Sequence, residues 1–377
     1  MKKHSTQNTQ LSTFICTFAP KETTFARTNY MKPSTLYTKT TTLDHIIYCF
    51  TIAVLTLFSC HTRQNPLEQS SQVILEEGCY PHATLWQGCY YYTMQQPDAD
   101  CVVLYAADQL EHLAQGRRQV VLPADSLQHI WSPELHRIDG KWYLYFEADD
   151  GNTDNHQLYV MENPSDDPMK GTFRMKGAIK TNEEWNFGLH PTSIVVRGKQ
   201  YLLWSGWQHR RSETETQCIY IARMLNPWTL DSERVLLSKP ELEWERQWIN
   251  PNGDRSNYPI FVNENPEAFI TPDQHYVCVC YSASGIWTVY NTLGMLYARA
   301  DADLLDIRSW TKMQEPVVRC MPDSTVFGIS DICVVPSVDG QHHYLLYEAK
   351  QYDDEGSFHR NIQMRPLGWN DEGLPRF

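Results

Sequence analysis

Four carboxylates, a phenol and an imidazole stand at comparable places in this sequence, beside a proline or at the start of an apolar run. They are Tyr80, Glu134, His190, Glu264, Glu267 and Asp331. Carboxylates and imidazoles that share a cleft can donate and accept protons during bond cleavage. A carboxylate can also bind a metal ion. Either chemistry requires a fold that brings these distant residues together.

An internal repeat supplies such a fold. A short apolar strand, a tight turn and an aromatic strand recur five times, starting near residues 80, 132, 190, 265 and 330. The pairs Asp139-Gly140 and Asp339-Gly340 are strong hairpin signals. The spacing leaves about sixty residues per copy, enough for four strands. The repeat predicts an all-β, five-bladed β-propeller, whereas a β-sandwich would not show this blade-scale period.

The propeller predicts where the site lies. The innermost strand of each blade lines the central axis, and a proline belongs at a strand start because it cannot donate to the ladder. The residues beside the prolines are therefore expected to meet at one mouth of the channel. Aromatic faces bind sugars well, and four further residues are candidate stacking platforms there. They are Trp131, Trp207, Trp287 and Tyr290.

The first 60 residues read as a disordered N-terminus followed by a lipoprotein-type signal peptide, with Met31 the more ordinary start. The apolar run 46–58 is too short to span a bilayer. It ends in 57–60 (LFSC), which resembles a lipobox with Cys60 as the lipidated residue. The alternative is a plain secretory signal with an incidental Cys60. Residues 61–73 are a tether, and 74–377 form the propeller. We expect an exported bacterial lipoprotein, at the periplasmic face or cell surface, held to the membrane through Cys60.

Charge and cysteine spacing narrow the function classes. The formal net charge of −13 gives no support for a polyanion-binding surface, so nucleic acid is not expected as a partner. The eight cysteines after Cys60 contain no C-x-x-C pair, so a zinc ribbon is unsupported. Export permits disulfides, but their pairing stays open. Cys278 and Cys280 share one strand face and are expected to fill the core.

Several motifs, in order, resemble family 43 glycoside hydrolases. They are 130–136 (IWSPELH) with 139–143 (DGKWY), 204–207 (WSGW), 262–266 (VNENP), 281–285 (YSASG) and the closing stretch 347–373. The resemblance covers residues 74–377. It implies a five-bladed propeller acting on arabinose- or xylose-containing glycans, or on galactans, with plant-type polysaccharides or oligosaccharides as partners. It implies no required cofactor and leaves room for a structural calcium ion at the axis.

The family's chemistry uses a base Asp, a pKa-modulating Asp and an acid Glu. Glu264 matches the acid, although Asn265 replaces the Gly expected after it. Tyr80 stands at the base position, and a phenol is a poor base at neutral pH. His190 stands at the modulator position, where a cationic imidazole would lower the pKa of Glu264.

Other residues match the pattern of the family less directly. Asp331 occupies a position where many members carry a His, and it is the candidate metal ligand. Arg360 matches an Arg that reaches the pocket. Glu134 either binds sugar hydroxyls or buttresses its strand, and Glu267 also faces the cleft. Together with the four aromatic residues, Glu134, Glu267 and Arg360 are the candidate substrate-binding residues.

Three functions remain open. The first is a glycosidase in which Glu267, Glu134 or Asp331 replaces the missing base, or in which Tyr80 acts as a nucleophile as in sialidases. The second is a surface lipoprotein that binds carbohydrate without turnover. The third is an interaction scaffold, since propellers present rigid faces to partners.

Overall fold

The computed structural model describes residues 71–96, 99, 101–123, 127–183, 186–209, 216–249, 255–286, 288, 290–319, 327–350 and 359–377. The chain divides into two compact units, Met1–His61 and Thr62–Phe377, and every described residue belongs to the second. The expected signal peptide, Cys60 and Trp287 lie outside the described residues. Within the described residues, no helix is long and apolar enough to cross a membrane.

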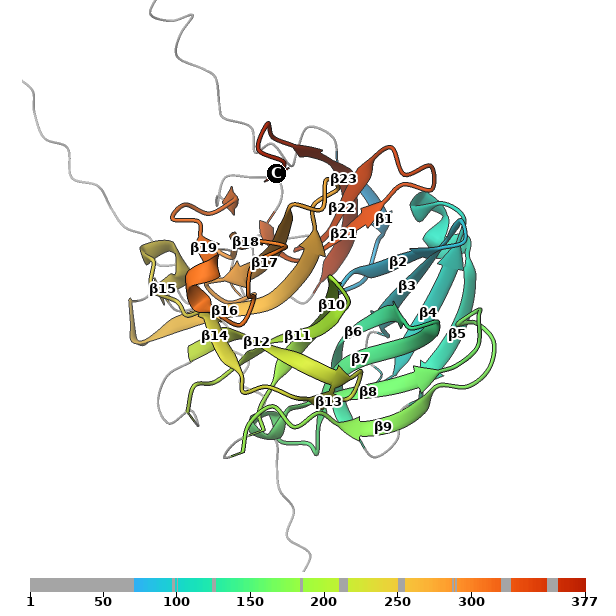
Figure 1. Ribbon diagram of the computed structural model, residues 1–377, viewed down its shortest axis with the longest axis horizontal. Coiled ribbons are helices and arrows are strands. Elements are labelled where there is room, and N and C mark those ends of the chain that lie inside the picture. The colour runs from blue at the N-terminus through green and yellow to red at the C-terminus, as the bar shows by residue number, and fades with distance from the viewer. Residues whose placement is uncertain are drawn as a thin grey trace, which may run out of the picture. The chain divides into compact units, whose positions relative to one another are not determined.

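The described chain is nearly all β, and its strands form five blades that follow one another in sequence (Figure 1). Blade 1 contains β2 (His82–Trp86), β3 (Cys89–Gln95), β4 (Val102–Ala107) and β5 (Arg117–Leu122). Blade 2 contains β6 (Gln128–Ile138), β7 (Lys141–Asp149), β8 (Gln157–Asn163) and β9 (Arg174–Ala178). Blade 3 contains β10 (Leu189–Val196), β11 (Lys199–Gly206), β12 (Thr216–Asn226), β13 (Thr229–Leu230) and β14 (Val235–Ser238).

Blade 4 contains β15 (Arg246–Ile249), β16 (Arg255–Ile270), β17 (Tyr276–Ala283), β18 (Thr292–Arg299), β19 (Trp310–Lys312) and β20 (Val318–Arg319). Blade 5 contains β21 (Phe327–Pro336), β22 (His343–Lys350), β23 (Arg360–Trp369), β24 (Pro375–Arg376) and the N-terminal strand β1 (Gln72–Leu75). Four short 3₁₀ helices complete the described elements: η1 (Leu110–Gln115), η2 (Thr153–Asn155), η3 (Glu243–Glu245) and η4 (Ile307–Ser309).

Two pairings join the blades into a ring. Strand β1 begins at Gln72, inside the predicted tether, and pairs antiparallel with β23, so the start of the propeller completes its last blade. A short parallel pairing between β12 and β16 joins blades 3 and 4. A ring of blades leaves only short, protected strand edges, whereas long exposed edges would invite pairing with other chains.

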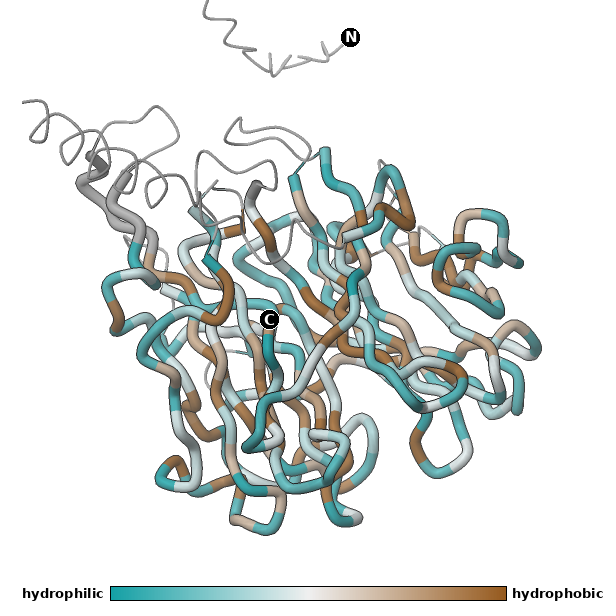
Figure 2. Tube along the Cα trace, turned by 90° about the horizontal axis from the view of Figure 1, so that it is seen from above, coloured by the Kyte–Doolittle hydropathy of each residue, from teal (hydrophilic) through white to brown (hydrophobic). Residues whose placement is uncertain are grey.

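Apolar residues of neighbouring blades pack face to face in five clusters. Strand β4 shows why both faces of a strand are apolar. Val103 and Tyr105 pack with blade 5, while Val102 and Leu104 pack with blade 2. Successive side chains of a strand point to opposite faces, so a blade between two others needs an almost continuous apolar run. Figure 2 shows the brown, apolar residues concentrated along the strands and the teal residues on the connecting loops.

The cysteines contribute to this packing as thiols. Cys278 and Cys280 lie on the same face of β17 and pack in one apolar cluster, as the sequence predicts. The seven described cysteines of the propeller are free, so none of them forms a disulfide in this structure.

Candidate active site

Each blade has a residue in a left-handed backbone conformation at or just before the inner part of its innermost strand. These residues are Tyr80, Ser132, His190, Asn265 and Asp331, with φ between 42° and 53°. In the last four, the pairing register between the first and second strands shifts at this point, which is the signature of a β-bulge. Such backbone strain costs about 1–3 kcal/mol at each non-glycine residue and is concentrated at functional sites. All five residues line one hollow at the axis.

The second strand of the preceding blade holds four of these five left-handed residues in place. Tyr80 N donates to Glu348 Oε2 at 2.9 Å, and His190 N donates to Glu147 Oε2. Asn265 N donates to Ser205 Oγ at 3.1 Å, and Asp331 N to Ser282 Oγ at 3.3 Å. A buried backbone N–H that makes no hydrogen bond to the neighbouring strand needs another acceptor. The four acceptors occupy equivalent positions in β7, β11, β17 and β22, so the same hydrogen bond recurs from blade to blade.

Glu264 lies one residue before the bulge of β16 and is 2% exposed. Its Oε1 accepts a hydrogen bond from Ile286 N at 2.9 Å. Burial raises the pKa of Glu264 to about 7, although the Ile286 N–H and the Arg360 charge oppose that rise. A carboxyl group with such a pKa is still substantially protonated near neutral pH and is suited to donate a proton.

The Tyr80 ring lies 6.0 Å from the His190 ring, measured between centroids. Burial, followed by the nearby Cys79 and Asp331, raises the pKa of the Tyr80 phenol well above its ordinary value. The phenol therefore stays protonated at neutral pH. A protonated phenol cannot accept a proton from water, so Tyr80 is unsuited to be the general base.

His190 is buried, and its Nε2 lies 3.6 Å from Glu147 Oε1. Burial lowers the pKa of the imidazole to about 3, so His190 is neutral at pH 7. The sequence hypothesis of a cationic His190 that depresses the pKa of Glu264 is therefore wrong. Desolvation of the ring outweighs the attraction of the nearby carboxylate.

Arg360 and Glu348 form a buried ion pair beside the hollow, with side chains 4% and 1% exposed. Arg360 Nη1 also donates to Ser330 Oγ at 2.9 Å, and Nη2 donates to Ile286 O. Because Ile286 N donates to Glu264, the Ile286 backbone contacts both the Arg360 guanidinium and the Glu264 carboxyl group. Glu348 was not expected from the sequence, because an isolated Glu in an apolar strand carries no motif.

Asp331 is 8% exposed and lines the hollow with Tyr80 and His190. Burial, followed by the neighbouring Glu348, raises its pKa well above the ordinary value. Its Oδ2 has no hydrogen-bond partner among the described residues. This oxygen is therefore available to a water molecule, a sugar hydroxyl or an ion.

Glu134 and Glu267 also line the hollow, and each has a partner of its own. Glu134 Oε2 lies 2.8 Å from His136 Nε2, and Glu267 Oε1 accepts from Val334 N at 3.4 Å.

The aromatic candidates fall into different surroundings. Trp131 is half-buried and stacks on His156, with 4.5 Å between ring centroids. Trp207 is 4% exposed and stacks on Phe187 at 3.8 Å, so Phe187 covers one of its faces. Tyr290 is half-buried, and its N–H donates to Thr288 Oγ1 at 3.2 Å. Neither Trp207 nor Tyr290 lines the axial hollow.

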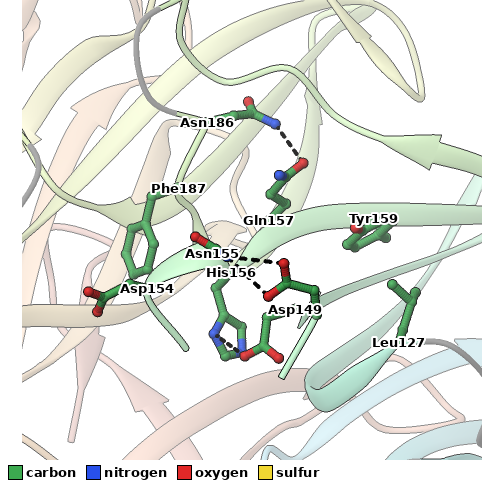
Figure 3. Close-up of a pocket in the computed structure, with 10 residues that line it drawn as sticks. Leu127, Asp149, Asp154, Asn155, His156, Gln157, Tyr159, Asn186 and Phe187 are labelled. Atoms are coloured by element: carbon green, nitrogen blue, oxygen red, sulfur yellow. Dashed lines mark hydrogen bonds and ion pairs between the residues drawn. The ribbon is translucent and has the colours of Figure 1, made fainter. Parts of the chain in front are cut away.

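A second pocket of about 330 Å³ opens on blade 2 (Figure 3). His156 and Phe187 line it, which connects it through stacking to Trp131 and Trp207. His156 Nδ1 lies 3.0 Å from the buried Asp149 Oδ2, as the close-up shows. The volume lies at the lower end of the range for small-molecule sites.

The comparisons with known proteins identify the family of this chain. The model of glycosyl hydrolases family 43 matches residues 79–375. The chain belongs to this family. The resemblance and the propeller fold expected from the sequence are therefore confirmed.

Three relatives of this family member are informative. An extracellular exo-α-(1→5)-L-arabinofuranosidase of Streptomyces avermitilis is 33% identical over 77% of this chain and 59% of its own length. One of Streptomyces chartreusis is 34% identical over 71% of this chain and 78% of its own. The crystal structure of an α-L-arabinofuranosidase from Lactobacillus brevis has a TM-score of 0.72 and 30% identity, covering 82% of this chain and 96% of that one. The chain thus spans about six tenths of the Streptomyces avermitilis relative.

Proposed function

We propose that this chain is a glycoside hydrolase that removes α-L-arabinofuranosyl residues from arabinose-containing glycans. The observation that carries the proposal is the buried Glu264, whose pKa of about 7 suits a general acid. The family membership and the names of the arabinofuranosidase relatives support the substrate class. Arabinose- or xylose-containing plant polysaccharides are the partners that this proposal implies.

Asp331 is the proposed replacement for the missing base. Glu134 and Glu267 are engaged with other groups, whereas Asp331 has a free carboxylate oxygen in the hollow that it shares with Tyr80 and His190. Water attacks the anomeric carbon as Asp331 takes its proton. The glycosidic C–O bond breaks as Glu264 transfers its proton to the leaving oxygen.

The remaining candidates have binding roles in this proposal. Trp131 is the stacking platform beside the hollow, and the blade 2 pocket accepts the neighbouring part of the glycan. Arg360 is a positioning residue, because it contacts Ile286 O while Ile286 N holds Glu264.

The pH dependence tests this function. With an α-(1→5)-arabino-oligosaccharide, whose leaving oxygen needs a proton, kcat/KM should fall about tenfold per pH unit above pH 7, because the acid must be protonated. The value of kcat/KM should also fall as the pH is lowered, because Asp331 must be ionised. This fall should begin at a higher pH than the pKa of an ordinary Asp, because the pKa of Asp331 is raised. Turnover that increases steadily above pH 8 would contradict Glu264 as the acid.

Carbohydrate binding without turnover is the second candidate, and one observation favours it. The phenol at the base position has a raised pKa, so Tyr80 cannot supply the proton acceptor. Aryl arabinofuranosides, xylosides and galactosides distinguish the two functions. Absence of turnover on all three, together with measurable binding of arabino-oligosaccharides, would establish the second candidate over the first.

We further propose that the protein is exported and anchored to the membrane through Cys60. Support comes from the apolar run that ends in LFSC and from relatives named as extracellular. In a bacterial host, Cys60→Ala should abolish incorporation of radiolabelled palmitate and move the protein out of the detergent-soluble membrane fraction. Cys49→Ala, inside the apolar run, is the matched control and should leave both unchanged. Equal labelling of the Cys60→Ala protein would contradict the anchor.

A further inference from the structure

A second group of side chains lies beside the bulge residues, and three of its members line the same hollow. It consists of His82 in β2, Glu134 and His136 in β6, Glu267 in β16 and Cys333 in β21, here called the axial cluster. The ligand atoms of His82, Glu134 and His136 all lie within 4.8 Å of one another. The same holds for His82, Glu267 and Cys333. Four blades therefore contribute donors to two groups that share His82.

One carboxylate oxygen faces both imidazoles. Glu134 Oε2 lies 2.8 Å from His136 Nε2 and 3.7 Å from His82 Nδ1. The His82 and His136 rings are 4.8 Å apart, measured between centroids. The two imidazole nitrogens and the carboxylate oxygen that they face are three candidate donor atoms for one metal ion.

His82 lacks a partner on the side that faces this site. Its Nε2 lies 3.2 Å from Leu135 O, which can only accept, so Nε2 carries the proton. Nδ1 then has a lone pair, and it has no hydrogen-bond partner among the described residues. His82 is 7% exposed. A buried lone pair that faces a carboxylate oxygen is unfavourable, and a cation between the two groups removes that cost.

We propose that His82, Glu134 and His136 bind one divalent transition-metal ion of the zinc type. Two imidazole nitrogens and one carboxylate oxygen are a usual zinc donor set. Calcium takes six to eight oxygen ligands, so the same donors disfavour it. Glu267 supplies a second carboxylate beside the first and balances the two positive charges of the ion. The site shares no ligand with Asp331, the residue that the sequence suggested as a metal ligand.

An ion can reach this site without passing Glu264. His82, His136, Glu267 and Cys333 also line a wide opening of about 630 Å³, which contains neither Tyr80 nor Asp331. The proposal therefore does not depend on glycosidase activity. Its consequence is structural, because an ion bound to β2 and β6 joins blades 1 and 2 across the channel. Binding to the folded state stabilises that state by mass action.

The experiment is a zinc titration of the purified full-length chain after removal of metals, at pH 7.5, against a chromophoric chelator. We expect about one zinc ion per chain and a higher melting temperature with zinc. His82→Gln and His136→Gln should each weaken zinc binding by more than about 100-fold, since even outer-shell partners of a metal account for 10–100-fold. His112→Gln is the control, because this side chain is 58% exposed on η1.

Two further measurements keep the result decisive. Calcium at the same concentration should not compete, and Glu134→Gln provides a near-isosteric ligand variant should either histidine variant fail to fold. The proposal is overturned if the wild-type chain binds no zinc at micromolar concentration. It is equally overturned if folded ligand variants retain wild-type affinity, or if Asp331→Asn abolishes binding while His82→Gln does not.

Discussion

Replacing Glu264 by glutamine should lower kcat/KM for α-(1→5)-arabino-oligosaccharides by about 10²–10⁴-fold, the usual contribution of one general acid. The amide cannot transfer a proton to the leaving oxygen. It still offers an oxygen to Ile286 N, so the fold and the binding of the glycan should persist. Steady-state hydrolysis of a defined oligosaccharide, with circular dichroism as a check on folding, measures the effect.

The leaving group separates acid catalysis from a general structural defect. A dinitrophenyl arabinofuranoside releases a stable anion that needs little protonation, so Glu264→Gln should affect it far less than the oligosaccharide. Glu315→Gln is the matched control, since its side chain is 82% exposed, and it should hydrolyse both substrates as the wild type does. Equal losses on both substrates in the Glu264→Gln variant would argue against a proton donor.

Replacing Arg360 by methionine should lower the free energy of unfolding by about 3–5 kcal/mol, because it leaves the buried Glu348 without its cation. Glu348 also accepts Tyr80 N at 2.9 Å and Ser330 Oγ at 2.6 Å, so the carboxylate cannot easily move to solvent. Urea unfolding followed by tryptophan fluorescence measures the difference.

Two controls accompany this variant. Arg308→Met breaks an ion pair whose side chains are 87% and 30% exposed, and it should destabilise the protein far less than Arg360→Met, because solvent screens an exposed pair. The double variant Arg360→Met with Glu348→Gln should be more stable than Arg360→Met alone, because no uncompensated charge remains. Similar stabilities for Arg360→Met and Arg308→Met would show that the buried pair is not energetically important.

The blades and their hairpins could be predicted because their signals are local. The pairs Asp139-Gly140 and Arg197-Gly198 each have two residues with positive φ, as a two-residue hairpin turn requires. The strand period and the prolines then placed Tyr80, His190 and Asp331 at one hollow, which is where the structure has them. These features depend on a few neighbouring residues and on a repeat that the sequence shows directly.

The supporting contacts could not be predicted in the same way. Glu348 meets Tyr80 across 268 positions of the chain, and Glu147 meets His190 across the interface of two blades. The protonation of His190 and Tyr80 depends on how deeply the folded chain buries them. The axial cluster likewise requires β2, β6, β16 and β21 to be placed around one axis, because its histidines and carboxylates have no spacing that marks them as metal ligands.

A crystal structure of the Glu264→Gln variant with an arabino-oligosaccharide bound would test most directly whether the bulge residues form the catalytic centre. We predict a sugar at the axial mouth, with its glycosidic oxygen within hydrogen-bond distance of residue 264 and a water molecule on Asp331 Oδ2. A glycan confined to the outer surface of the blades, with the mouth filled by solvent, would contradict the proposed function.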